Sequence, residues 1–196
     1  MDFQEVVRNR RMIRNYSDAP VERDVIERLV EAGLRGPSAG FAQGQYVVVV
    51  TDPGTRRRIA ELADEDRYAA LGLPRWISSA PVHLVVCTSE ADYRSRYKEP
   101  DKLEDGREID WPVPYWHVDA GATMMLLLLA AVDEGLGAGF FGVRRLPGLQ
   151  ELLGIPDEVT PIGVVTVGHP AAGEQPKGSA ERGRKKRSEK VRWERW

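Results

Sequence analysis

The chain is poor in cysteine and histidine. Cys87 is the only cysteine among 196 residues, so an intrachain disulfide is impossible and we expect a reducing cytoplasm. It lies in the β-type run VHLVVCT, which favours a buried and inert thiol. The three histidines lack the spacing of metal ligands, which argues against a zinc site.

Targeting segments and several enzyme motifs are also missing. The N-terminus, MDFQEVVRNRR, lacks the apolar core of a signal peptide, and no apolar stretch reaches the roughly 20 residues that a bilayer demands. We therefore expect no membrane partner. There is no GxSxG, HExxH, CxxC or Walker motif. The glycines of Gly135–Gly139 follow a predicted helix instead of joining a strand to one, so they make a poor dinucleotide fingerprint.

The charge is unevenly distributed. Residues 177–196 carry nine Lys or Arg and three Glu, a net of +6, which leaves 19 basic and 27 acidic residues, a net of −8, in the remainder. Three interpretations of this basic segment remain open: a solvated tail, an anion-binding site, or non-specific nucleic-acid binding. The acidic body and the lack of a nucleic-acid-reading motif weaken the last of these, and we expect no nucleic-acid partner.

The chain is organised around the segment Asp119–Glu134, DAGATMMLLLLAAVDE. Its apolar residues cover every side of a helix, so we expect a helix that is buried on all faces. Two settings remain open. The helix is either an ordinary core helix of a monomer or part of a dimer interface.

Other segments predict a layered α/β or α+β domain spanning residues 1–196. Helices are expected at residues 2–10, 21–33, 55–66 and 147–153, and strands or extended segments at 45–51, 82–88, 137–143 and 161–168. Residues 35–44 read as a loop, 171–179 as a linker, and 89–116 as a long irregular excursion of the kind that covers a site or is mobile.

Arginine is the remaining chemical signal. Arg10, Arg11 and Arg14 lie near one end of the chain, and a second basic cluster lies near the other. The planar guanidinium suits phosphate oxygens, so converging arginines make an anion site, whereas separate clusters are ordinary surface charge.

Four stretches in register resemble the nitroreductase-like FMN-dependent oxidoreductase family. Residues 10–16, RRMIRNY, are similar to the family's RRSIRxF box, and residues 36–45, GPSAGFAQGQ, to its APSxxNxQPW loop. Residues 119–137 resemble DxGxAxxNLxLAAxxLGLG, and the ending VRWERW looks like a common family tail. The resemblance implies an α+β, three-layer α/β/α fold in which helices flank a central, mostly antiparallel sheet. It also implies an intertwined homodimer with two FMN sites, in which the arm 177–196 wraps the partner subunit.

The resemblance also implies roles for both basic clusters. Arg10, Arg182, Arg184 and Lys185 would surround the FMN phosphate. Opposite ends of the chain would thus build one anion site.

Further positions are implied along the flavin. Arg11 and Met12 would line the ribityl chain and ring edge, and Arg14 would lie at N1 and O2, where a fixed cation favours the reduced flavin. Phe141 and Gly142 match the family's backbone contact near N5, the atom that accepts hydride.

The loop before the first strand would act across the dimer. Pro37, Ser38 and Ala39 would come from the partner subunit and cover the ring. The chain departs from the family at Phe41, where Asn is common, and near Trp76, where some members have Asn and Lys. These departures bear on substrate and nicotinamide preference.

The function implied by the resemblance is hydride transfer from NADPH or NADH to FMN and then to a small-molecule acceptor such as a nitroaromatic or quinone, in a ping-pong sequence without a protein acid–base catalyst. Phe41, Trp111, Tyr115 and Trp116 are candidates for the substrate pocket, with packing as the alternative. His117 is either a proton donor or a packing residue. A specialised branch (dehydrogenase, dehalogenase or flavin-destroying enzyme) and a flavin-storage protein are the alternative functions.

Overall fold

The computed structural model describes residues 1–143, 146–173 and 181–196. Its elements follow one another as α1 (Phe3–Asn9), α2 (Arg23–Leu34), η1 (Ala39–Phe41), β1 (Gln45–Val50), α3 (Pro53–Leu62), α4 (Glu65–Ala70), α5 (Trp76–Ser79), β2 (Val82–Thr88), α6 (Glu90–Arg96), α7 (Tyr115–Asp133), β3 (Gly137–Gly142), α8 (Leu149–Leu153), β4 (Thr160–Gly168) and η4 (Arg187–Glu189).

The four strands form one antiparallel sheet in the order β1-β2-β4-β3. β2 is central, and all seven of its residues are buried, as its nearly unbroken apolar run predicts. β1 lies at an edge and leaves Tyr46 and Val49 exposed. The expected mostly antiparallel sheet is confirmed.

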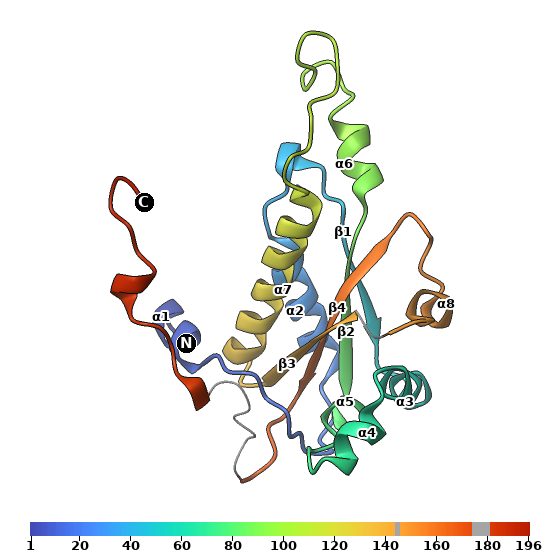
Figure 1. Ribbon diagram of the computed structural model, residues 1–196. Coiled ribbons are helices and arrows are strands. Elements are labelled where there is room, and N and C mark those ends of the chain that lie inside the picture. The colour runs from blue at the N-terminus through green and yellow to red at the C-terminus, as the bar shows by residue number, and fades with distance from the viewer. Residues whose placement is uncertain (144–145, 174–180) are drawn as a thin grey trace.

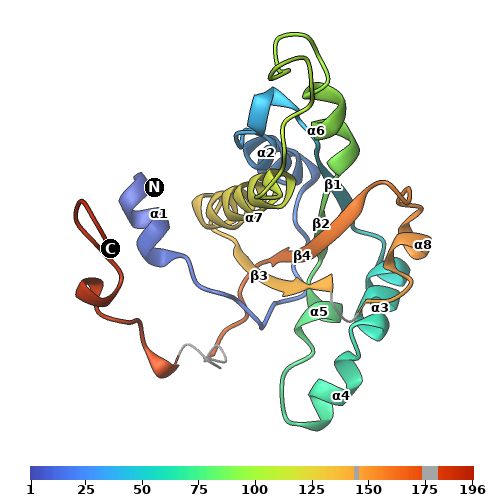
Figure 2. The same cartoon turned by 45° about the horizontal axis from the view of Figure 1, so that its top comes forward.

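Helices cover both faces of the sheet (Figures 1 and 2). On one face, α2 and α7 pack against alternate residues of the inner strands, among them Leu84 and Val165. On the other face, α3, α5 and α8 pack against the residues between these, among them Val85 and Val164. Because side chains alternate along a strand, the two central strands supply two separate cores. The three-layer α+β architecture is therefore confirmed.

The central helix differs from its expected extent. α7 begins at Tyr115, four residues before Asp119, and its 19 residues have the length and apolar composition of a membrane-spanning helix. The expectation that no stretch is long enough to span a bilayer was therefore wrong on length. The helix packs on the sheet and on α2, where Leu127 fills the space that a side chain at Gly33 would need.

Burial of α7 is one-sided in a single chain. Leu127 and Leu128 are buried on its inner face, whereas Val118 is 53% and Met125 42% exposed on its outer face. Within one chain only the inner face of the helix, which meets the sheet and α2, is buried, so a single chain does not by itself reach the expected burial on all faces.

Three further segments differ from expectation. The helix expected at 55–66 is two helices, because Ala63 ends α3 and Asp64 takes a left-handed φ of 57° before α4. The loop at 35–44 contains η1, and the irregular excursion at 89–116 contains α6 and the start of α7. Residues 174–179 of the expected linker lie outside the described residues. Beyond them, the arm 181–196 stands away from the sheet and from α7, on the side of α1 (Figures 1 and 2).

Candidate functional site

The segment after α1 runs along the outer edge of β3. Met12 forms a parallel bridge with Ala138, and the N–H of Ile13 donates to the carbonyl of Ala138 at 2.9 Å. This close approach requires glycine in β3, because a Cβ at Gly139 would lie 2.6 Å from the carbonyl oxygen of Ile13. Arg10–Arg14 is thereby fixed beside the strand that carries Phe141.

Tyr16 fastens this segment to the sheet. Its hydroxyl lies 2.8 Å from Thr166 Oγ1 and 3.2 Å from the Thr166 carbonyl, and it contacts the Ile13 carbonyl at 3.0 Å. The ring is 6% exposed, and burial raises the pKa of the phenol well above its ordinary value. Tyr16 therefore acts as a neutral hydrogen-bonding anchor and does not titrate near neutral pH.

Trp76, at the start of α5, joins two of the predicted cofactor residues. The guanidinium carbon of Arg14 lies 5.5 Å from the centroid of the Trp76 ring, within the range of a cation–π contact. The same ring meets Phe141 edge to face, with 5.5 Å between centroids. Arg14 and Phe141 come from opposite halves of the chain, so this contact sets a cation beside the β3 backbone.

His83 supports this group from within the sheet. Its Nε2 lies 2.7 Å from the Ile77 carbonyl and must donate to it, and its ring centroid is 6.5 Å from that of Phe141. Nδ1 is buried and has no hydrogen-bond partner among the described residues. Burial lowers the pKa of His83 to about 4, with the nearby Arg56 adding to the effect, so the ring is neutral at neutral pH.

The end of β3 is open to a flat ligand. A Cβ placed on Gly142 would meet no atom within 4 Å. Backbone groups alternate between the two edges of a strand. The Ala138 carbonyl bonds to Ile13 on the outer edge, so the N–H of Gly142, four residues on, faces the same edge. A backbone donor, a nearby cation and free space at one edge fit the polar edge of a flavin ring.

The loop with the predicted ring-covering residues lies elsewhere in the chain. Pro37, Ser38 and Ala39 lead into η1, where the N–H of Ala39 donates to Asp119 near the start of α7, whereas β3 follows the end of that helix (Figure 1). Within the loop, Ser38 Oγ accepts from the N–H of Gln43 at 3.0 Å. One chain thus separates the loop from the Arg14–Phe141 group by the length of α7.

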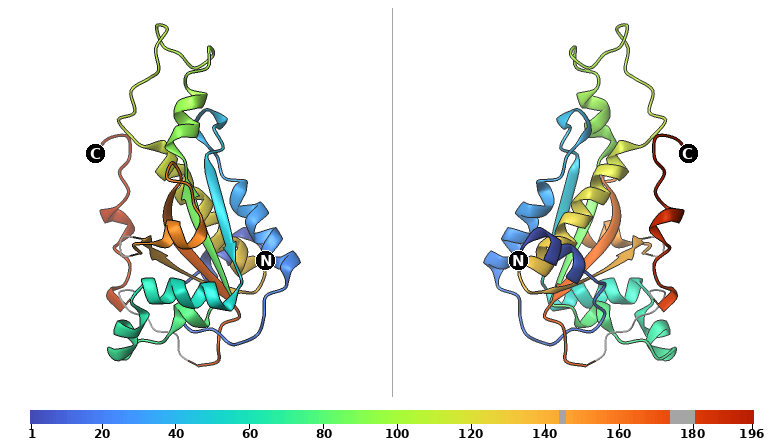
Figure 3. Two further views of the ribbon diagram at one scale, coloured as in Figure 1. Left: turned by 90° about the vertical axis from the view of Figure 1, so that its right-hand side faces the viewer. Right: turned by 90° about the vertical axis from the view of Figure 1, so that its left-hand side faces the viewer.

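The basic positions are separated too. Arg182, Arg184 and Lys185 are exposed on the arm, whose hydrogen bonds among the described residues, such as that from Arg192 to the Ser188 carbonyl, stay within it. Arg10 is partly buried and Arg11 exposed, both on the body. The arm and α1 lie on the same side of the molecule in Figure 1, and Figure 3 shows that they are apart. A single chain does not assemble the predicted phosphate site.

The four substrate-pocket candidates fall into two pairs. Trp111 and Trp116 pack together, with ring centroids 5.5 Å apart, and Trp116 is only 7% exposed. Phe41 is 77% and Tyr115 45% exposed. The described chain thus uses the two tryptophans for packing and leaves the other two rings open. His117, in the first turn of α7, is exposed as well.

Two features of the site escaped the sequence reading. The stacking role of Trp76 depends on a fold-level contact with Arg14, for which the sequence carries no local signal. The second is Asp119, which is buried and accepts a hydrogen bond from the loop at 35–44. The sequence did carry a signal for this role, because Asp119 is a single carboxylate at the start of an otherwise apolar segment and a buried carboxylate needs hydrogen-bond donors.

Known proteins resemble the chain in both sequence and structure. The family model described as Nitroreductase family matches residues 7–169. A putative NADH dehydrogenase/NAD(P)H nitroreductase of Methanothermobacter thermautotrophicus is 30% identical over 175 residues, which cover 87% of this chain and 78% of the relative. The FMN reductase [NAD(P)H] of Bacillus subtilis is 35% identical over 168 residues, covering 82% of this chain and 63% of the relative.

A solved structure agrees with these matches. The NADPH:FMN oxidoreductase of Vibrio harveyi, complexed with NAD+, superposes with a TM-score of 0.74 at 25% identity, covering 98% of this chain and 77% of that chain. Fold and site therefore define a three-layer α+β protein with a cationic, aromatic group at the outer edge of β3. The chain belongs to the nitroreductase family.

Proposed function

We propose that this chain is an FMN-dependent NAD(P)H oxidoreductase that acts as a homodimer. The observation that carries the proposal is the group along the outer edge of β3, where Arg14, Trp76, Phe141 and the open backbone at Gly142 meet. Of these, Arg14, Phe141 and Gly142 match cofactor positions that the family motifs imply. The relatives named as FMN reductase and NADPH:FMN oxidoreductase support the choice of cofactor and donor.

Bound FMN would supply a ring nitrogen that takes a hydride from NADPH or NADH and passes it to an acceptor such as a nitroaromatic or quinone in a second, ping-pong step. The protein's task is binding and electrostatics. The N–H of Gly142 would hold the ring edge, and Arg14 would stabilise negative charge on the pyrimidine side. Met12 and Arg11 would line the ribityl chain.

The homodimer accounts for the features that one chain leaves apart. The exposed outer face of α7, with Val118 and Met125, is apolar surface that a second subunit would cover. In this arrangement residues 1–196 form one domain, and the arm 177–196 wraps the partner. Pro37, Ser38 and Ala39 would cover the partner's flavin, and Arg182, Arg184 and Lys185 would join Arg10 at the phosphate.

The test is the visible spectrum of the purified protein, before and after anaerobic addition of NADPH and then NADH. Flavin bands that bleach with a donor and return with a quinone support the proposal and identify the donor. Bands that neither donor bleaches indicate flavin storage instead. A colourless protein that takes up no added FMN overturns the proposal.

The anion site has its own control, because riboflavin lacks the phosphate. Arg10→Gln is expected to weaken FMN binding roughly tenfold and to leave riboflavin binding unchanged, since one charge-assisted hydrogen bond is lost. Equal weakening of both ligands would contradict a phosphate role for Arg10.

A further inference from the structure

The loop between α2 and β1 has a strained backbone. Gly40, Phe41 and Gln43 all have positive φ, at 61°, 59° and 53°. A positive φ is costly for a bulky side chain, and it persists only where the surroundings impose it. Phe41 is nevertheless the most exposed ring of the candidate pocket. Something other than burial of its own side chain must hold the loop in this shape.

One grip comes from α7. Asp119 Oδ2 accepts hydrogen bonds from the N–H of Ala39 and from the hydroxyl of Tyr93, each at 2.9 Å. The carboxylate is 7% exposed and Tyr93 fully buried. A buried carboxylate needs such donors, so the loop, α6 and α7 are tied at one atom.

A second grip comes from α6. Arg96 Nε donates to the Gly40 carbonyl at 2.9 Å, and the outer nitrogens of the same guanidinium bind Asp101 at 2.8 and 2.7 Å. The Tyr97 ring occupies the space beside Gly40, where a Cβ would lie 2.6 Å from a ring carbon. Arg96 and Tyr97 therefore contact the very residue at which the chain enters the positive-φ region.

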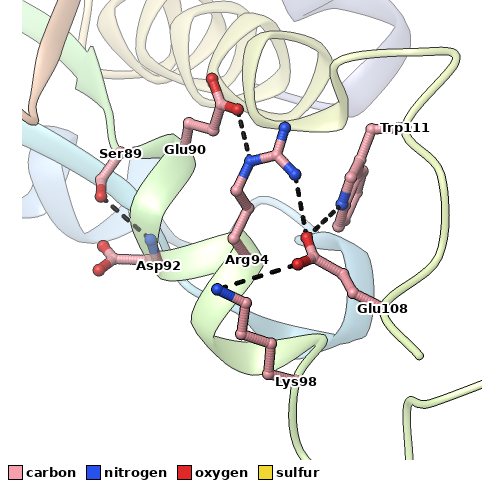
Figure 4. A network of polar contacts seen from close by, with 7 residues as sticks. All are labelled: Ser89, Glu90, Asp92, Arg94, Lys98, Glu108 and Trp111. Atoms are coloured by element: carbon pink, nitrogen blue, oxygen red, sulfur yellow. Dashed lines mark hydrogen bonds and ion pairs between the residues drawn. The ribbon is translucent and has the colours of Figure 1, made fainter. Parts of the chain in front are cut away.

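A polar network braces α6 in turn (Figure 4). Arg94 binds Glu90 at 2.6 Å and Glu108 at 3.0 Å, and the indole N–H of Trp111 donates to the same Glu108 oxygen at 3.0 Å. Trp111 also packs on Tyr97, with ring centroids 4.6 Å apart. The segment between β2 and α7 thus returns on α6 and presses Tyr97 towards the loop.

From these contacts we infer that Arg96 and Tyr93 are positioning residues that set the Ala39–Phe41 backbone and hence the placement of the Phe41 ring. The inference rests on the proposed function, which puts this loop over the flavin. Phe41 then forms an apolar wall at the acceptor's side, suited to planar aromatic acceptors. The segment 89–114 determines acceptor preference through this loop, without contacting the acceptor itself.

The test compares Arg96→Met with the matched control Asp101→Asn. Both variants lose the ion pair between these residues, but only Arg96→Met loses the bond to the Gly40 carbonyl. The first readout is amide hydrogen exchange of the segment 37–44 in flavin-free protein. We expect exchange to rise roughly tenfold in Arg96→Met, as for one lost hydrogen bond from a charged donor, and to stay at the wild-type rate in Asp101→Asn.

The second readout uses FMN-saturated protein. With menadione, a planar quinone, Arg96→Met is expected to raise KM roughly fivefold or more at an unchanged rate of reduction by NAD(P)H. With ferricyanide, an inorganic acceptor that needs no aromatic pocket, turnover should match wild type. Tyr93→Phe removes one hydroxyl and keeps the ring, so it should shift both readouts in the same direction.

Each outcome decides a separate point. Unchanged exchange in both Arg96→Met and Tyr93→Phe overturns the grip on the loop. Raised exchange with an unchanged menadione KM overturns the positioning role and leaves a purely structural one. Wild-type protein that binds no FMN overturns the proposed function and with it the role in acceptor preference. The comparison of hydrogen exchange still tests whether Arg96 and Tyr93 hold the loop in place.

Discussion

Replacing His83 by Gln should remove a pH-dependent component of stability. His83 lies in the buried strand β2 between Val50 and Thr166, and its Nε2–H donates to the Ile77 carbonyl. A glutamine amide can make the same donation. Protonation of the histidine would add a hydrogen at Nδ1, which is buried without a partner in the described chain, and would place positive charge near Arg56.

The sign follows from the two protonation states. In the folded protein the pKa of His83 is lowered from 6.5 to about 4, so between these values the unfolded chain binds more protons. Stability therefore rises with pH through this window and is lost as the pH falls from 6.5 towards 4. At about 1.4 kcal/mol per unit, the loss is about 2 kcal/mol by pH 5 and about 3 kcal/mol by pH 4.

The assay is urea unfolding, followed by tryptophan fluorescence at one protein concentration, from pH 7.5 to pH 4. The difference in unfolding free energy, wild type minus His83→Gln, should shift against the wild type by the amounts above as the pH falls. Any constant cost of the substitution cancels in this comparison. His169→Gln is the control, because His169 is exposed, and it should leave the pH dependence as in wild type. Parallel curves for wild type and His83→Gln would refute the reasoning.

Three shorter predictions concern the site. Gly139→Ala should destabilise the protein by roughly 1–3 kcal/mol in urea unfolding, because its methyl group overlaps the Ile13 carbonyl; an unchanged midpoint would contradict the close packing at β3. Trp76→Leu should lower the flavin midpoint potential while Trp76→Phe preserves it, since only the latter keeps a ring under Arg14; spectroelectrochemistry decides, and equal potentials for both variants would oppose the stacking role. Arg184→Gln should weaken FMN roughly tenfold and riboflavin not at all in fluorescence titrations; a matching loss for riboflavin would remove the arm from the phosphate site.

The strands were predictable because their signal is local. The β-branched runs of β1, β2 and β4 identify strands without reference to any partner, although β1, expected to be buried, is an edge strand in which only Val50 is buried. Two misses also had a local signal. Ser89 caps α6 by accepting from the N–H of Asp92, an S-x-x-D pattern, and Pro114 precedes the first turn of α7.

The remaining features depend on contacts between distant segments. The hydrogen bond between Ala39 and Asp119 joins residues 80 positions apart, and no periodicity in the sequence predicts it. The resemblance located Arg14 and Phe141 in sequence, but their meeting through Trp76 required the fold. The predicted phosphate group is divided between body and arm, so a single chain cannot display it.

The Tyr16 anchor has a consequence for how the protein is made. Its partner, Thr166, lies 150 residues further along the chain, so the edge of β3 cannot be closed until β4 has been synthesised. At about 10 residues per second on the ribosome, roughly 15 s pass between the synthesis of residues 12–16 and that of Thr166, to which Tyr16 binds. Contacts of such long sequence separation are also slow to form, because the chain loses the conformational entropy of loop closure before these contacts stabilise it. Cofactor capture is accordingly expected to be one of the last events in the maturation of each chain.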